Sequence, residues 1–232
     1  MGNIKLVVVG FFAVICTVVF ASGYSGGSGI ASDPYLISNK ADLLELGETT
    51  ADYAKCFKMT ANIDLEGVGF STAVIAGTTK QGSFKRIYIK YDGTKFTGVF
   101  DGNGHKILNL HIFDGEHALY TGLFGCIGKG GVVKNLKLVD CEINALSKSG
   151  GICSRNEGSI LNCSASVEIN AYHIIGGLCA INDGVISNCY TTGYILADGF
   201  VDMTGGDSRA VSGGVCGSNG GIYSLVIQRL IL

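Results

Sequence analysis

The chain has 232 residues, of which 47% are hydrophobic and 16% are charged, and its formal net charge is −2. This share of apolar residues excludes an intrinsically disordered chain, and the near-neutral charge argues against a nucleic-acid-binding protein, which needs a basic surface. The 36 glycines and single proline, without a glycine at every third position, exclude collagen and predict many tight turns between short strands.

Residues 1–23 have the pattern of a secretory signal peptide. Lys5 precedes an uncharged apolar run over 6–20, and small residues from Ala21 onward offer a cleavage site. An uncleaved membrane anchor is the alternative, but the run is shorter than the ~20 residues that a span needs. We therefore expect an exported chain that is secreted or held at the cell surface, with a membrane involved only if this segment stays uncleaved.

Residues 24–96 are predicted to form an N-terminal cap and the first strands. Ser38 or Asn39 can cap a short helix over Lys40–Leu46. A hairpin arm is predicted over Ser83–Tyr91, because hydrophobic residues alternate there and a turn signal follows. The apolar side of the helix is predicted to hold Ala41, Leu43 and Leu44. Such a cap would cover the open edge of the first coil.

A repeated pattern dominates the region 97–232. The stretch GGICSRNEGSILNCS, from Gly150, returns 26 residues later as GGLCAINDGVISNCY, from Gly176. Units this short cannot bury a face alone and must stack on one another, whereas the blades of a β-propeller need about 40 residues or more. The chain therefore predicts an all-β fold, a right-handed parallel β-helix (solenoid) with one coil per copy. Three weaker copies start at Gly98, Gly122 and Gly213.

Aligned copies place cysteine in columns that other copies fill with phenylalanine or leucine. A position that accepts all three residues selects apolar bulk, so the cysteines are predicted to be buried core residues. Structural zinc sites place ligands two to four residues apart, whereas Cys153 and Cys163 are ten apart. Disulfides between stacked pairs are the alternative, since neighbouring coils bring Cα atoms within the permitted range. The first column holds Phe100, Phe124, Cys153, Cys179 and Cys216, and the second holds Leu110, Leu136, Cys163, Cys189 and Leu225.

A further column of the alignment is predicted to be a structural asparagine corner. Asparagine tolerates the left-handed backbone conformation, and stacked amide side chains can hydrogen-bond from coil to coil. The column comprises Asn109, Asn135, Asn162 and Asn188, with Ser224 in the last copy.

The pattern G-G-[LI]-C-x-x-N-[ED]-G-x-I-x-N-C of the copies at Gly150 and Gly176 resembles the bacterial GLUG repeat. The segments Tyr24–Gly47 and Phe96–Ile112 resemble the parts that precede such repeats. The resemblance implies a β-helical module that is often named with adhesins or appended to larger exported proteins, and it brings no catalytic residues. No cap or stop follows the apolar stretch 224–232, so we expect an incomplete last coil that can self-associate.

These observations favour a non-catalytic exported scaffold that adheres to, or binds, an unknown surface partner, either carbohydrate or protein. We expect no enzyme activity, no cofactor, no metal site and no nucleic-acid partner. His105, His111 and His117 are interpreted as solvent-facing, because no second set of metal ligands accompanies them. The alternative is a carbohydrate-active β-helix, either carbohydrate-binding or similar to a polysaccharide lyase. Its candidate residues lie in the longest insertion and are Asp198, Asp202, Asp207 and Arg209.

Overall fold

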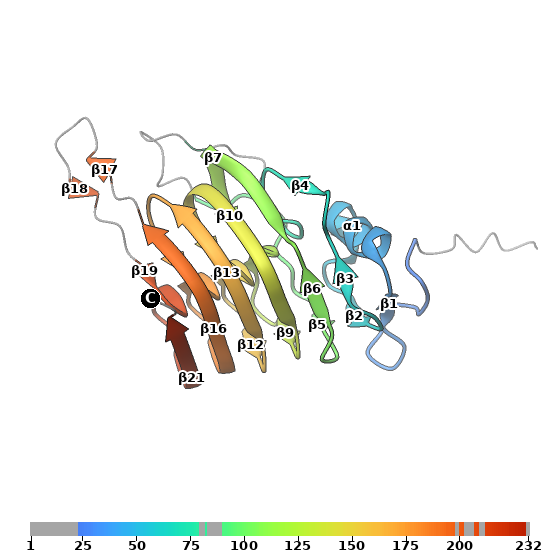
Figure 1. Cartoon of the computed structure of the whole chain (residues 1–232). Helices are drawn as coiled ribbons and strands as arrows, with labels where there is room; N and C mark the ends of the chain where they lie inside the picture. The colour runs from blue at the N-terminus through green and yellow to red at the C-terminus, as the bar shows by residue number, and fades with distance from the viewer. Residues whose placement is uncertain are drawn as a thin grey trace, which may run out of the picture.

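The described part of the chain is a parallel β-helix, which confirms the fold predicted from the repeat (Figure 1). The predicted signal peptide and most of the hairpin arm lie outside the described residues. The computed structural model describes residues 23–78, 82, 90–197, 200–201, 207–208 and 212–230, with side chains at all of these positions except 114–116, 200–201, 207–208 and 223–230.

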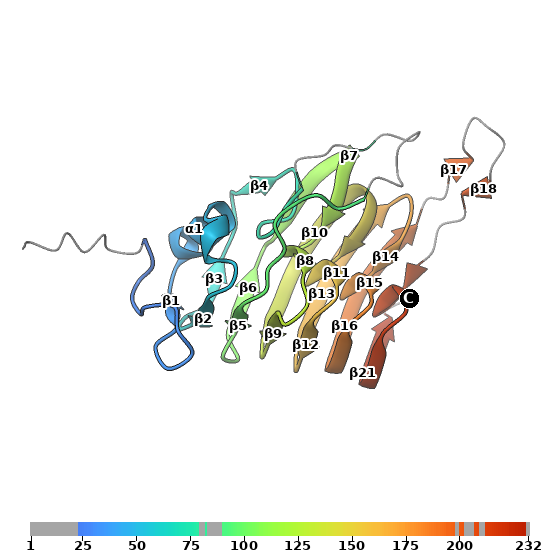
Figure 2. The same ribbon diagram turned by 180° about the vertical axis from the view of Figure 1, so that it is seen from behind.

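One side of the β-helix is a four-stranded parallel sheet, the back wall, which faces the viewer in Figure 2. Its register stacks Phe124 on Cys153, Cys153 on Cys179, and Cys179 on Cys216. From Phe124 onward, the observed register therefore matches the first column of the sequence alignment. The strands are β8 (Phe124–Ile127), β11 (Cys153–Asn156), β15 (Cys179–Asn182) and β20 (Cys216–Asn219).

The opposite side is built from longer strands, and their outward faces form a surface that we call the long wall (Figure 1). Successive side chains of a strand point to opposite faces, so Ile143 and Ile169 are buried while Glu142 and Glu168 are exposed. The long strands are β7 (His111–Thr121), β10 (Lys137–Gly150), β13 (Ser164–Ala171) and β16 (Val185–Ala197). Further strands complete the coils: β5 (Val99–Asp101), β6 (Lys106–Leu108), β9 (Val132–Lys134), β12 (Ser159–Leu161), β14 (Ile175–Gly176), β19 (Ser212–Gly213) and β21 (Ile222–Leu230), which pairs with β16.

The N-terminal cap contains the predicted helix, α1, at the end of the β-helix where β1 begins (Figure 1). Asn39 caps it, because its side-chain oxygen accepts a hydrogen bond from the Asp42 amide at 3.1 Å. The predicted apolar side was partly wrong: Leu43 and Leu46 are fully buried, but Ala41 is exposed. The helix is turned this way because Asp42 is also buried, with its carboxylate accepting two hydrogen bonds. The elements here are β1 (Tyr35–Ile37), α1 (Lys40–Glu48), η1 (Thr50–Asp52), β2 (Cys56–Met59), β3 (Ile63–Asp64) and β4 (Gly69–Phe70).

The first weak copy is stacked differently from the predicted alignment. Phe100 lies opposite Val133 rather than in the column of Phe124. Leu108 pairs with Val139 and His111 with Glu142, so Asn109 lies level with Asp140, not with Asn135. The alignment was wrong here because Val99-Phe100 resembles Leu123-Phe124 in residue type. Backbone pairing instead places Val99-Phe100 beside Val132-Val133, in the next strand of the coil.

The last copy is also offset from the alignment, by one residue. Ile222 lies opposite Val185, and Ser224 lies opposite Ser187. Cys189 therefore pairs with Val226 instead of Leu225, and Ser224 does not continue the asparagine column. Leu225 and Val226 are both hydrophobic, so the sequence pattern fits Cys189 opposite either residue equally well.

Candidate functional site

The predicted asparagine corner is present in three successive coils. Asn135, Asn162 and Asn188 all have φ of 53°, the left-handed conformation. Asn188 donates a hydrogen bond to the Asn162 side chain at 3.2 Å, and Asn162 donates to Asn135 at the same distance. Asp101 ends this ladder by accepting from Asn135 at 2.9 Å. Asn109 has φ of 56° but belongs to a different corner, where it donates to Asp64.

A second asparagine ladder, buried at two of its three members, lies at the end of the back wall. Asn156 and Asn182 have no exposed surface. Asn156 donates to the Asn182 side-chain oxygen at 2.7 Å, and Asn182 donates to that of Asn219 at 2.8 Å. The sequence analysis missed this ladder, although the asparagine before each acid-glycine turn was its signal. Both ladders stack coil on coil, so their contribution is structural.

The repeat cysteines lie in the core as free thiols. Cys153 and Cys179 are fully buried and their sulfur atoms are 3.5 Å apart, while Cys163 and Cys189 form a second stacked pair. Burial raises the pKa of the Cys179 thiol well above its usual range, which suppresses the reactive thiolate. Cys216, predicted as a core residue, is partly exposed because it lies in the last strand of the back wall.

Thiol counting tests this arrangement. Of the eight cysteines among the described residues, we expect only Cys56 and Cys216, which are partly exposed, to react with a thiol reagent in the native protein. In denaturant without reductant, all eight should react. A denatured count that reached eight only after reduction would show that stacked pairs had formed disulfides.

The exposed hydrophobic side chains are concentrated on the long wall. Six large hydrophobic side chains of the described residues stand exposed, and four of them lie on strands of the long wall. Scattered single residues of this kind are ordinary, whereas a contiguous group indicates an interaction site. Three of the four lie together on β16, and the fourth lies three strands away on β7. The four are Phe113 (50% exposed), Tyr190 (49%), Tyr194 (55%) and Leu196 (36%).

Strand register aligns the outward-facing residues of the long wall in rows that run across the strands. His111, Glu142, Glu168 and Tyr194 lie opposite one another on β7, β10, β13 and β16, and we call them the central row. Two positions further along the strands, the same pairing aligns a second row. This second row consists of Phe113, Asn144, Asn170 and Leu196.

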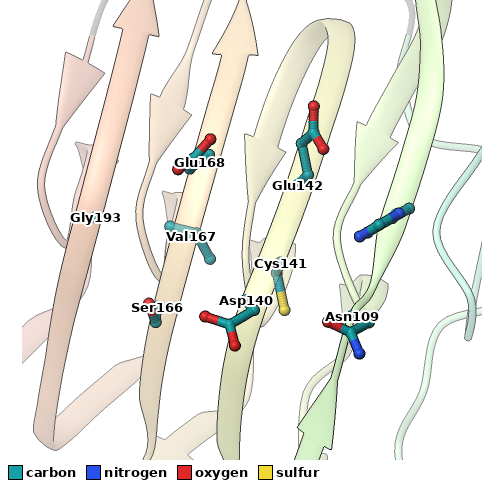
Figure 3. Close-up of a pocket in the computed structure, with 9 residues that line it drawn as sticks. Asn109, Asp140, Cys141, Glu142, Ser166, Val167, Glu168 and Gly193 are labelled. Carbon is teal, nitrogen blue, oxygen red and sulfur yellow. The ribbon is translucent and has the colours of Figure 1, made fainter. Parts of the chain in front are cut away.

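Three residues of the central row, His111, Glu142 and Glu168, line a surface hollow of about 280 Å³, and Figure 3 labels its two glutamates. Glu142 and Glu168 border this hollow and also a second one of about 180 Å³, so the two hollows are neighbours on the wall. Figure 3 shows Asp140 and Glu142 on one strand, with Glu168 on its neighbour. The second hollow is lined by Tyr194 and Leu196. The wall therefore offers carboxylate, amide, imidazole and aromatic groups beside two neighbouring hollows.

A bulge and a glycine shape the first hollow. Between Leu138 and Cys141, β10 has two residues where β13 has one, and the extra residue Asp140 has φ of 54°. On the far side, Gly193 has φ of 112°, and a Cβ atom there would lie 2.1 Å from the Val167 carbonyl oxygen. Only glycine fits this approach, and its missing side chain leaves the hollow open.

The described residues contain no group of three or more His, Cys, Asp or Glu side chains that could hold a metal ion.

The candidate residues of the lyase alternative belong to the insertion after β16. Their side chains are not among those that the structure describes. Within that insertion, β17 (Phe200–Val201) and β18 (Asp207–Ser208) pair in an antiparallel manner. The long-wall site was not predicted from the sequence, in which His111 was interpreted only as a solvent-facing residue.

Comparison with known proteins gives partial similarities. No family model matches the chain. Halomucin of Haloquadratum walsbyi is 32% identical over 140 residues, which is 60% of this chain and 2% of that protein. A protein of Evansella cellulosilytica named as a Gly-rich membrane protein is 29% identical over 157 residues, 63% of this chain and 16% of that protein. The chain thus spans only a small part of both relatives.

A solved structure of a candidate immunoglobulin A1 protease from Bacteroides ovatus aligns over 89% of this chain and 80% of that one. Its sequence identity is 16% and its TM-score is 0.36, so it carries no argument about function. Among the described residues, no helix has the length and apolar character needed to cross a membrane.

Proposed function

We propose that this chain is a non-catalytic, exported, surface-associated β-helix of the GLUG-repeat type, and that its long wall binds carbohydrate. The observation that carries the proposal is the gathering of four of the six exposed large hydrophobic side chains on that wall. A sugar has an apolar face and a polar edge. Exposed aromatic rings can stack on its apolar face, and nearby carboxylate and amide oxygens can accept hydrogen bonds from its hydroxyl groups. The names of the two relatives, a halomucin and a membrane protein, fit a location at the cell surface.

No observation favours catalysis. A lyase acting on acidic polysaccharide needs a basic residue beside its carboxylates to abstract or stabilise a sugar proton. The central row contains two carboxylates and one basic side chain, His111, but no lysine or arginine to pair with the carboxylate of an acidic sugar. Turnover of polygalacturonate with calcium, abolished by the substitution Arg209→Ala, would contradict the non-catalytic proposal.

Retention of the full chain, recovered after export, on polysaccharide beads tests the binding proposal. The beads carry cellulose, chitosan or polygalacturonate, and we expect retention on at least one of them. The double variant Phe113→Ala/Tyr194→Ala should bind at least about tenfold more weakly, because it removes two aromatic contacts. Ile30→Ala is the matched control, since Ile30 is 54% exposed but lies outside the long wall. Equal losses in both variants, or no retention on any bead, would contradict the proposal.

A further inference from the structure

The long wall carries three carboxylates around its central row, where His111 is the one basic side chain. Glu142 and Glu168 lie directly opposite each other on neighbouring parallel strands, which places their Cα atoms about 5 Å apart. Asp140 lines the same hollow. Like charges directly opposite each other on a sheet destabilise it, so this pairing costs the protein stability when nothing is bound.

No described residue forms an ion pair with any of these three carboxylates. The ion pairs of the described residues lie elsewhere and are Lys95–Glu157, Lys134–Asp101, Arg155–Glu157 and Arg155–Asp183. On the long wall, Lys137 precedes Glu142 by five residues, or roughly 16 Å of extended strand. Solvent screens charges over about 8–10 Å, so this lysine does not neutralise the central row.

Building on the proposed function, we infer that the carbohydrate is a glycan with free amino groups, which lies along the axis of the β-helix. Protonated amino groups would complement Glu142, Glu168 and Asp140, whereas an acidic glycan would be repelled. A metal ion is a poorer occupant, because the described residues offer no set of three ligands for one.

The spacing of the wall matches a glycan better than an extended peptide. Neighbouring strands are about 4.8 Å apart, close to the length of one sugar ring in a linear polymer. Successive sugars would therefore meet successive strands, from Tyr194 at one end to Phe113 at the other. His111 packs against the Phe113 ring in an edge-to-face arrangement, with centroids 5.7 Å apart. An extended peptide repeats its side chains on one face every two residues, which is a longer interval than the strand spacing.

Titration calorimetry with three hexasaccharides tests the inference. The sugars are a glucosamine hexamer, its N-acetylated form and a galacturonate hexamer, at about pH 5.5, where carboxylates are ionised and free amino groups are protonated. We expect the glucosamine hexamer to bind at least about tenfold more tightly than the acetylated form, and the galacturonate hexamer to show no binding. The double variant Glu142→Gln/Glu168→Gln should lose this preference and keep its affinity for the acetylated hexamer.

The control variant Glu48→Gln/Glu66→Gln removes the same charge at two exposed positions away from the wall and should retain the preference. Equal affinity for the free and acetylated hexamers, or an unchanged preference in Glu142→Gln/Glu168→Gln, would overturn the amino-glycan inference and leave carbohydrate binding intact. If none of the hexamers or polysaccharide beads bound the wild-type chain, the proposed function itself would fail.

Discussion

Replacing Asn182 by leucine, a side chain of similar size, should lower the free energy of unfolding by about 2–4 kcal/mol. Asn182 occupies the middle of the buried ladder and has no exposed surface. It accepts from Asn156 at 2.7 Å and donates to Asn219 at 2.8 Å, and its oxygen also accepts from the Gly184 amide at 3.3 Å. Leucine would remove these three hydrogen bonds, and water cannot replace the one to the fully buried Asn156.

Urea unfolding followed by far-ultraviolet circular dichroism measures this loss, since the chain has no tryptophan to report by fluorescence. The control is Asn162→Gly, which removes the middle of the exposed ladder and keeps a residue that tolerates the left-handed conformation. Water replaces hydrogen bonds at that exposed position, so the control should cost about 1 kcal/mol or less. Equal losses at Asn182 and Asn162 would show that burial does not separate the two ladders.

The coil architecture could be predicted from the sequence because stacking repeats the same physical demand at each level. Gly176 and Gly150 lie where another coil's backbone comes close, and the aliphatic and cysteine positions that follow fill the core. Where two strand registers bury apolar residues equally well, the sequence pattern could not distinguish them. This is why Phe100 and Ser224 were placed in the wrong columns.

The candidate site could not be predicted from the repeat for the opposite reason. His111, Glu142, Glu168 and Tyr194 occupy equivalent positions of successive coils, yet no two neighbours beyond the glutamate pair are alike. An alignment that searches for identity treats such a row as variable surface. The row becomes visible only when pairing places it beside the hollows and the exposed rings.

The substitution Phe124→Ala should be the most damaging of the single changes considered, at about 4 kcal/mol. Phe124 has no exposed surface and lies in the column between Ile75 of the preceding coil and Cys153 of the next. Its ring centroid lies 5.1 Å from that of Phe96 and 5.6 Å from that of Phe100. Alanine would remove these contacts and leave a cavity between the cap and the narrower cysteine-lined coils.

Phe113→Ala provides the matched control, because it deletes the same ring from a side chain that is 50% exposed on the long wall. It should change the free energy of unfolding by about 0.5 kcal/mol or less, and should weaken binding to polysaccharide beads. Phe124→Ala should shift the urea midpoint strongly, while any folded fraction keeps its long wall and its binding. If Phe113→Ala destabilised the fold as much as Phe124→Ala does, the exposed ring would belong to the core, and the long wall would lose its main argument as a binding surface.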